Sequence, residues 1–344
     1  MPSPPAVPGK PAGRSLRRRI GRFLVRLFAL AALVAAAGAT GYVAHDSLPS
    51  GTANQAAVSP STEVIAEPLP PPPPTSAATS VPPPQIGGDA GILPPLDGSG
   101  AASVKVRGTA ARALVLLDAA DGRVLLARHE HRPLPIASLT KVMTAVLAVR
   151  GGHLSQELRI RRQWLGIGGS SIYLVPRQRI TVRMLLYGLL MVSGNDAANV
   201  LATYRAGSVP SFVEAMNAEA RRLGLDDTRF SSPSGLLDRG NRSTAWDVAD
   251  LARYLLEQPL LAEITRTKTL PAPHHVTWVN HNRLLFRYAG ANGMKTGYTD
   301  VSGPCLVASA TRKGRTLIAV VLHAKGDEFT VAERMLDWGF AHPG

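Results

Sequence analysis

Prolines divide this chain into a part that can fold and a part that cannot. Of its 28 prolines, thirteen lie between residues 45 and 100, including a run from Pro70 to Pro74. A stretch of this kind has no periodic apolar positions with which to bury a core, and it favours extended polyproline II. We therefore predict a Pro-rich disordered linker over residues 45–103, and a single folded domain over residues 104–344.

The residues before the linker have the order of charge and hydrophobicity that is typical of a membrane-targeting segment. Residues 1–26 carry seven bases and no acid, and residues 27–44 are apolar. At about 1.5 Å per residue this apolar run is long enough for a bilayer core, and the flanking arginines favour a cytoplasmic N-terminus. We predict a transmembrane anchor at 27–44, with a cleaved signal segment as the alternative. Both place the domain in an extracytoplasmic location.

Strand patterns occur at both ends of the domain, and helical patterns lie between them. Apolar runs at 111–118 and 123–127 flank an Asp-Gly turn, and runs at 305–310 and 316–323 flank a Lys-Gly turn. Helices are expected over 138–149, 182–191, 196–204, 209–223, 244–256 and 329–340. The pattern predicts an α+β fold in which helices cover a sheet whose strands come from distant parts of the chain.

The charge of the chain excludes some functions. The net charge is +14, but the bases are scattered, aromatic residues make up only 5%, and no nucleic-acid motif is present, so no nucleic-acid partner is expected. The positive charge would also attract an anionic cell-wall polymer.

Cys305 is the single cysteine and is expected in the core. His274, His275 and His281 lack the H-E-x-x-H pattern, so no metal site is predicted.

A lysine lies inside a stretch that otherwise has the pattern of a buried helix. The segment IASLTKVMTAVLAV, residues 136–149, leaves hardly any side of a helix polar. Burying an ammonium without a partner is costly, and Ser138 is the helical neighbour of Lys141 three residues away. One interpretation is that Lys141 is a base that activates Ser138 as a nucleophile. The alternative is that Ser138 only caps the helix and Lys141 extends to the surface.

Two further tripeptides carry polar groups that suit a substrate. Ser193-Gly194-Asn195 separates two helical patterns and offers a hydroxyl for proton relay and a carboxamide, although a simple helix end and cap would have the same sequence. Lys295-Thr296-Gly297 follows an expected turn at Ala291-Asn292-Gly293. It offers a positive charge and a hydroxyl for a carboxylate, with a solvated strand edge as the alternative.

The three motifs, taken in this order, resemble the active-site motifs of the penicillin-binding proteins and class A β-lactamases. Within that group, PIASLTKVMTA, TVRMLLYGLLMVSGNDAANVLA and NHNRLLFRYAGANGMKTGYT are similar to segments of the serine-type D-alanyl-D-alanine carboxypeptidases, and the likeness covers about residues 112–340. The resemblance implies a penicillin-binding/β-lactamase-like transpeptidase fold. In such a fold an antiparallel five-stranded sheet is flanked by helices, with a helical subdomain, and the site lies between sheet and helices.

The resemblance also implies a role for each residue of the motifs that takes part in the chemistry. Ser138 would be the acylated nucleophile, Lys141 its general base, and Ser193 the group that relays the proton to the leaving amine. Physical chemistry agrees, because an amine is a base near neutral pH only if its pKa is lowered. Burial beside a second ammonium lowers the pKa in this way.

Substrate-binding roles follow from the same resemblance. Asn195 would hold an amide of the substrate, and Lys295 and Thr296 would bind its carboxylate. The backbone N–H of Tyr298, together with that of the nucleophile, would form the oxyanion hole. Gly297, beside Tyr298, leaves the chain room to present that N–H.

The predicted enzyme is a serine-type D-Ala-D-Ala carboxypeptidase that trims peptidoglycan stem pentapeptides through an acyl-enzyme. β-Lactams would be covalent inhibitors, and neither cofactor nor metal is expected. A D,D-endopeptidase that cuts cross-links uses the same machinery and stays open. A β-lactamase is disfavoured because residues 226–237 contain no glutamate to activate a deacylating water. A non-catalytic wall-binding module is disfavoured because every motif residue is present.

Two features depart from the family pattern. Pro304 occupies a position where the family usually has an aromatic residue, and since proline removes a ladder donor, the strand is expected to be an edge or bulged there. The family often carries an extra C-terminal β-domain with an amphipathic anchor, whereas this sequence stops at Gly344. Tethering is therefore expected from the N-terminal segment.

Overall fold

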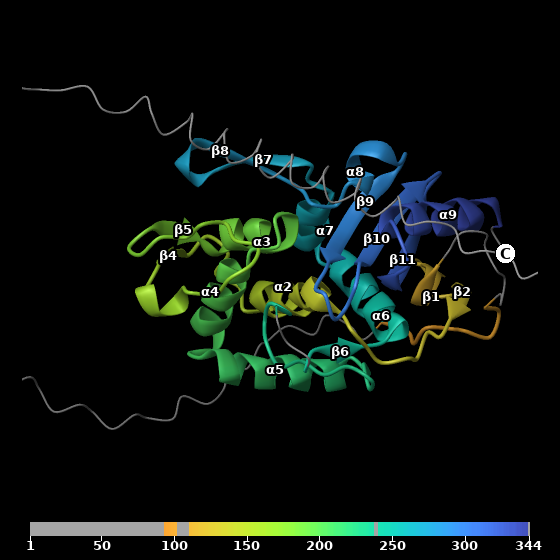
Figure 1. The fold of residues 1–344 in the computed structure, drawn as a ribbon, viewed down its shortest axis with the longest axis horizontal. Coiled ribbons are helices and arrows are strands. Elements are labelled where there is room, and N and C mark those ends of the chain that lie inside the picture. Colours follow the sequence, from red (N-terminus) through yellow and green to blue (C-terminus); the bar gives the residue numbers. More distant parts are fainter. Residues whose placement is uncertain (1–92, 102–109, 237–239, 343–344) are drawn as a thin grey trace, which may run out of the picture. The chain divides into compact units, whose positions relative to one another are not determined.

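The computed structural model describes residues 93–101, 110–236 and 240–342 (Figure 1). The predicted anchor at 27–44 and most of the predicted linker lie outside the described residues. Within the described ranges, no helix has the length and apolar character needed to cross a bilayer.

An antiparallel sheet of five strands organises the domain, in the order β2-β1-β11-β10-β9. Its strands are β1 (Ala111–Asp118), β2 (Val124–Arg128), β9 (Ala291–Gly297), β10 (Cys305–Arg312) and β11 (Arg315–Ala324). The first strand of the domain pairs with the last, with Leu116 opposite Ala319. The predicted α+β class and the pairing of distant segments are confirmed.

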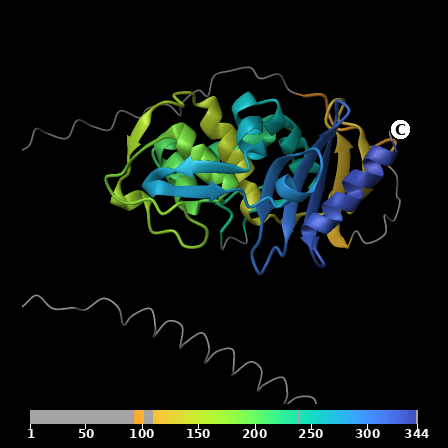
Figure 2. The same ribbon diagram turned by 90° about the horizontal axis from the view of Figure 1, so that it is seen from above.

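Helices cover both faces of this sheet. The α-helices of the described residues are α2 (Lys141–Arg150), α3 (Val182–Met191), α4 (Asn195–Ala206), α5 (Val209–Arg222), α6 (Ala245–Leu256), α7 (Pro259–Arg266), α8 (Leu284–Arg287) and α9 (Glu328–Ala341). Because side chains alternate along a strand, Leu114 and Leu116 pack in the cluster that contains Met335 of α9, whereas Val115 and Leu117 join the larger cluster with α2 and α6. Figures 1 and 2 show α9 on one side of the sheet and α2 and α6 on the other.

Side-chain caps explain several helix boundaries. The hydroxyl of Thr181 accepts a hydrogen bond from the backbone N–H of Met184 at the start of α3, and Thr244 does the same for Asp247 at the start of α6. Gly207, in the left-handed region at φ 77°, ends α4. Such signals are local. The helices expected from the pattern are confirmed, and most of their observed ends lie within two residues of the expected ones.

Three small sheets and three 3₁₀ turns complete the described fold. The remaining strands pair as β3 (Leu134–Pro135) with β6 (Arg242–Ser243), β4 (Glu157–Arg159) with β5 (Arg179–Thr181), and β7 (Thr269–Ala272) with β8 (Val276–Val279). The turns are η1 (Ala137–Thr140), η2 (Arg162–Trp164) and η3 (Pro273–His275). These pieces, α7 and α8 were not predicted from the sequence, since each is too short for a hydrophobic period to be distinct.

The predicted turn at Ala291-Asn292-Gly293 is wrong. These residues begin β9, and the reversal lies just before them, where Gly290 has φ 84°. A Cβ at Gly290 would lie 2.4 Å from the carbonyl oxygen of Thr311, so the strands approach closely at this point.

Pro304 does not disturb a strand interior. It lies immediately before β10, an inner strand that begins at Cys305, and its carbonyl accepts from the N–H of Ala324 at 2.9 Å. The expected edge or bulge at Pro304 is therefore wrong, because no ladder donor is lost within β10; the irregular register of this strand lies farther along, between Ser309 and Ala310. Cys305 is fully buried, as expected of a core residue.

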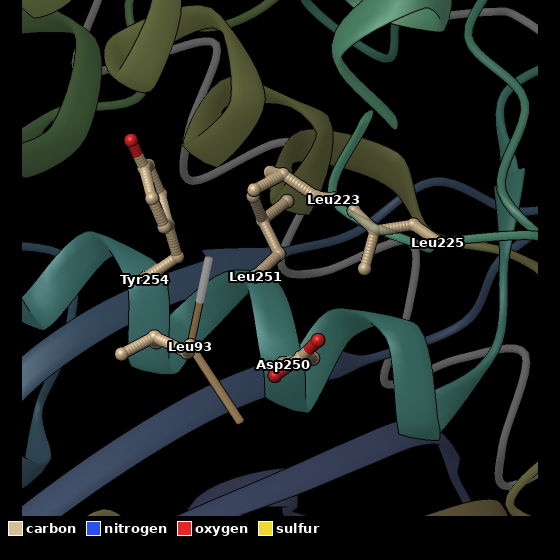
Figure 3. A pocket seen from close by; sticks show the side chains of 6 residues that line it. All are labelled: Leu93, Leu223, Leu225, Asp250, Leu251 and Tyr254. Atoms are coloured by element: carbon tan, nitrogen blue, oxygen red, sulfur yellow. The ribbon is translucent and has the colours of Figure 1, made fainter. Parts of the chain in front are cut away.

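Residues 93–101, which composition placed in the linker, pack against the domain. Asp97 forms an isolated bridge to Arg123, and Leu96 is 91% buried, at 9% exposure. The Arg253 guanidinium of α6 donates to the carbonyl of Pro94 at 2.9 Å. Leu93 lies over the same helix near Tyr254 (Figure 3). The folded domain therefore includes residues that precede 104, where the sequence predicted the domain to begin.

Candidate active site

The candidate nucleophile lies where a 3₁₀ turn runs into a buried helix. Ser138 is in η1, and Lys141 is the first residue of α2, so the expected single helix is η1 followed by α2. Lys141 has 0% exposure, and its Nζ lies 2.8 Å from Ser138 Oγ. The structure thus brings together the two residues that the sequence predicted as nucleophile and base.

The charge state of Lys141 follows from its surroundings. Burial first, and then the positive charge of Lys295, lower the pKa of Lys141 well below its ordinary value, while the Asp196 carboxylate opposes this in part. Above that lowered pKa the amine is neutral and its lone pair can accept a proton. The arrangement suits a general base.

A loop that the sequence analysis did not assign a role holds Lys141 in place. The Nζ of Lys141 donates to the carbonyl of Ser234 at 2.7 Å, and Thr144 of α2 donates to the carbonyl of Pro233. Gly235 of this loop has φ 75°, and a Cβ there would lie 2.0 Å from the carbonyl oxygen of Ala137. Only glycine permits so close an approach to η1, the turn that contains Ser138.

The second motif occupies the short connection between α3 and α4. Ser193 is buried and has φ 62°, a conformation that turns the chain sharply between the helices. Asn195 donates from Nδ2 to the carbonyl of Gly168 at 2.7 Å, and its N–H donates to the carbonyl of Ser170. Its buried Oδ1 has no hydrogen-bond partner within the described residues. One acceptor of the second motif is thus left unsatisfied.

Asp196 anchors the loop beside the second motif. Its carboxylate accepts hydrogen bonds from Ser171 Oγ at 2.7 Å and from the backbone N–H groups of Ile172 and Leu174 at 3.1 Å. The carboxylate therefore fixes the segment that contains Ser170. This role of Asp196 was not predicted from the sequence.

The third motif lies on β9, an edge strand of the sheet. Lys295 is 1% exposed, its Nζ donates to the carbonyl of Thr296 at 2.8 Å, and burial lowers its pKa to about 7. A Cβ at Gly297 would lie 3.0 Å from the carbonyl oxygen of Ile136 and 3.1 Å from the backbone nitrogen of Ser138. The end of β9 therefore runs directly beside Ser138, and the exposed Tyr298 follows it.

One pocket of about 380 Å³ joins parts of all three motifs. The predicted residues on its wall are Ser138, Ser193, Thr296, Gly297 and Tyr298; the others that line it are Ser170, His281, Arg283, Glu328 and Phe329. Lys141, Asn195 and Lys295 are buried and do not line the pocket.

The histidines do not form a metal centre in the part of the chain that the structure describes, where no group of three or more His, Cys, Asp or Glu side chains could hold an ion. His281 lines the pocket, whereas His274 and His275 lie in η3, outside it. Burial and the two active-site lysines lower the pKa of His281.

The fold and the pocket define a class of α+β protein in which a buried lysine lies beside a serine hydroxyl, and comparisons with known proteins give the family. Residues 101–326 match the family described as D-alanyl-D-alanine carboxypeptidase. The chain belongs to this family.

Relatives and solved structures agree with this assignment. The chain is 36% identical over 242 residues to the D-alanyl-D-alanine carboxypeptidase DacF of Bacillus subtilis, which covers 67% of this chain and 62% of the relative. DacC of Escherichia coli is 38% identical over 245 residues, covering 67% and 61%. The chain thus spans less than two thirds of the length of these relatives.

Among solved structures, penicillin binding protein 6B of Escherichia coli superposes with a TM-score of 0.66 at 34% identity, covering 71% of this chain and 82% of that one. A D-alanyl-D-alanine carboxypeptidase of Mycobacterium tuberculosis gives 0.64 at 33% identity, covering 73% and 95%. The predicted penicillin-binding-type fold is confirmed.

Proposed function

We propose that this chain is a serine D,D-carboxypeptidase that removes the terminal D-alanine from peptidoglycan stem pentapeptides through an acyl-enzyme. The observation that carries the proposal is the contact of 2.8 Å between Ser138 Oγ and the buried Nζ of Lys141. A buried amine of lowered pKa beside a serine hydroxyl in an open pocket is the arrangement that nucleophilic catalysis requires.

Acylation would begin with neutral Lys141. Its lone pair accepts the proton of the Ser138 hydroxyl as Oγ attacks the carbonyl carbon of the scissile D-Ala-D-Ala bond. The resulting oxyanion would accept hydrogen bonds from the backbone N–H groups of Ser138 and Tyr298, which the close approach of Gly297 supports. The C–N bond then breaks, and the proton passes through the Ser193 hydroxyl to the departing amine of D-alanine.

Substrate binding would use the polar groups around the pocket. The orphan Oδ1 of Asn195 would accept an N–H of the peptide. Protonated Lys295 and the Thr296 hydroxyl would bind the terminal carboxylate, and that negative charge would raise the lowered pKa of Lys295 in the complex.

Deacylation would need a water activated by the same lysine. The loop that contacts Lys141, Ser232–Gly235, carries no carboxylate. A second base of the kind that class A β-lactamases provide is therefore missing from this loop. A penicillin would acylate Ser138 and stay attached. A penicillin-binding protein of Listeria monocytogenes, solved in its ampicillin-bound form, resembles this chain at 30% identity and a TM-score of 0.63.

Intact-mass spectrometry tests the nucleophile. The full chain incubated with benzylpenicillin should gain one stable adduct of penicillin mass, and Ser138→Ala should gain none while keeping its thermal transition. Release of D-alanine from a synthetic stem pentapeptide should likewise disappear in the variant. An adduct that persists in Ser138→Ala, or a folded parent protein that forms none, would refute the mechanism. Faster cleavage of a cross-linked muropeptide than of the pentapeptide would instead indicate an endopeptidase.

The proposed site of action is the outer side of the cytoplasmic membrane. Residues 27–44 would anchor the chain, or be cleaved as a signal segment, and the proline-rich residues would separate the domain from the membrane. A fusion of a periplasmic reporter enzyme to the C-terminus should be active in cells, and removal of residues 1–44 should abolish that activity.

A further inference from the structure

A second concave surface lies apart from the active-site pocket. It is a groove of about 1060 Å³ over β4, η2 and the residues just before β5, and it shares no lining residue with the catalytic pocket. Figures 1 and 2 show β4 and β5 at the end of the domain opposite α9. The volume exceeds what most small ligands require, and it suits a segment of a longer molecule.

Arginines dominate this groove. Arg159, Arg161, Arg162 and Arg177 line it, and all four are exposed. Within the described ranges, none of their guanidinium groups forms an ion pair. The one acidic residue of the wall, Glu157, is already paired with Arg179 at 2.7 Å. Four like charges without counter-charges repel one another, so this arrangement is stabilised by an anion from outside the domain.

Aromatic side chains lie among these arginines. Trp164 and Tyr204 line the groove, and the guanidinium of Arg161 lies 5.3 Å from the centre of the Trp164 ring. Stacking of this kind holds the guanidinium in one orientation, which favours bidentate binding of a carboxylate or phosphate. Aromatic surfaces beside cations match a ligand with both apolar ring faces and negative charges, such as an acidic sugar.

The groove is connected to the active site along the chain. The segment between them leaves the groove at Trp164, contacts Asn195 through the carbonyls of Gly168 and Ser170, and returns to the groove at Pro176. A polymer bound in the groove is therefore only one loop away from the pocket that contains Ser138. Such a polymer would hold the domain close to the material on which it acts.

We propose that this arginine groove binds an anionic polysaccharide, in which carboxylate or phosphate groups recur along the glycan chain. That the ligand is a polysaccharide is inferred from the proposed cell-wall function. That it is anionic is inferred from the arginines of the groove itself. A concave surface with aromatic walls fits a chain better than it fits the plane of a membrane.

Calorimetric titration of the full chain with oligogalacturonate, which carries one carboxylate per sugar, tests the proposal. Binding is expected, and it should weaken strongly at about 0.5 M NaCl, while a neutral maltodextrin of equal length should not bind. The triple variant Arg159→Ala, Arg161→Ala, Arg162→Ala should bind oligogalacturonate about tenfold more weakly. The same series with phosphorylated dextran identifies the preferred anion, and binding of either glycan supports the proposal.

A matched variant separates the groove from the overall charge. Arg221, Arg266 and Arg334 are exposed and lie outside the groove. Their replacement by alanine removes the same charge and should leave glycan binding within about twofold of the parent. Equal weakening in the two triple variants would overturn the proposal, as would failure of the parent to bind either glycan. Tighter binding to anionic vesicles or to single-stranded DNA than to both glycans, lost in the groove variant, would overturn it too.

Acylation by benzylpenicillin, measured on the same samples, should be equal in all three proteins, because none of these arginines touches the catalytic pocket. Loss of acylation in the parent would refute the proposed function, while the glycan titration would still report on the groove.

Discussion

Two lysines that need different charges lie in the same buried site. In the proposed mechanism Lys141 would act as a base only when neutral, whereas Lys295 would attract a carboxylate only when protonated. Burial disfavours the charged form of both, and the charge of Lys295 lowers the pKa of Lys141 further. The protonated state of one lysine thus helps the other to be neutral, and the two functions are compatible over a limited range of pH.

The value of kcat/KM for a peptide substrate should therefore pass through a maximum with pH. It should fall on the acidic side as Lys141 is protonated, and on the alkaline side as Lys295 loses its proton above about 7. Lys295→Arg keeps its charge to above about pH 12, so the alkaline fall should move to higher pH in this variant. Steady-state kinetics from acidic to alkaline buffers measures both limbs. An alkaline limb that stays in place would exclude Lys295 as its source.

At the scale of elements, the end of β9 and the turn η1 are positioned by backbone contact. Gly297 lies close to the carbonyl of Ile136 and to the nitrogen of Ser138. A methyl group at this position would contact both atoms more tightly than most Cβ atoms contact their neighbours. Neither is a side chain that could rotate away. The distance between the strand and the nucleophile therefore depends on the absence of a side chain at this position.

Gly297→Ala should slow acylation by benzylpenicillin, but by less than the roughly hundredfold that a displacement of about 1 Å causes, because the added methyl group requires a shift of only a few tenths of an ångström. The melting temperature should change little, because the rest of the sheet is unaltered. Gly100→Ala, where a Cβ meets nothing within 4 Å, is the control and should acylate at the parent rate. Parent-like acylation in Gly297→Ala would show that β9 has room to move.

At the scale of the whole domain, segments far apart in sequence close the structure. β1 pairs with β11, and residues 93–101 lie across the edge of the domain, where Asp97 bonds to the hairpin at Gly122 and Gly98 packs on Trp246. The pairing of distant strands requires both ends of the domain to be present. The short segment before β1 therefore contributes to stability, although its composition resembles a linker.

A chain that begins at residue 102 should be less stable than one that begins at residue 92. Loss of the buried Leu96 and of the hydrogen bonds of Pro94 and Asp97 should cost about 3 kcal/mol. For a domain of this size the melting temperature should fall by roughly 6–12 °C. Thermal unfolding followed by circular dichroism compares the two chains. Identical transitions would mean that residues 93–101 do not stabilise the domain.

Local patterns in the sequence determined the longer helices, the two hairpins β1–β2 and β10–β11, and the residue types of the three motifs. Helical spacing alone placed Ser138 beside Lys141, because residues three apart on a helix are neighbours. The roles of these residues were predicted from the motifs and their order.

Only the tertiary structure decided what surrounds those motifs. The carbonyl of Ser234 accepts from Lys141, Asp196 holds the loop of Ser170, and β9 lies against η1. A backbone carbonyl is the same in every residue, so no amino-acid type marks it as a partner in the sequence. The burial that lowers the pKa of Lys141 and Lys295 likewise comes from packing between distant elements, which the sequence specifies only through the complete fold.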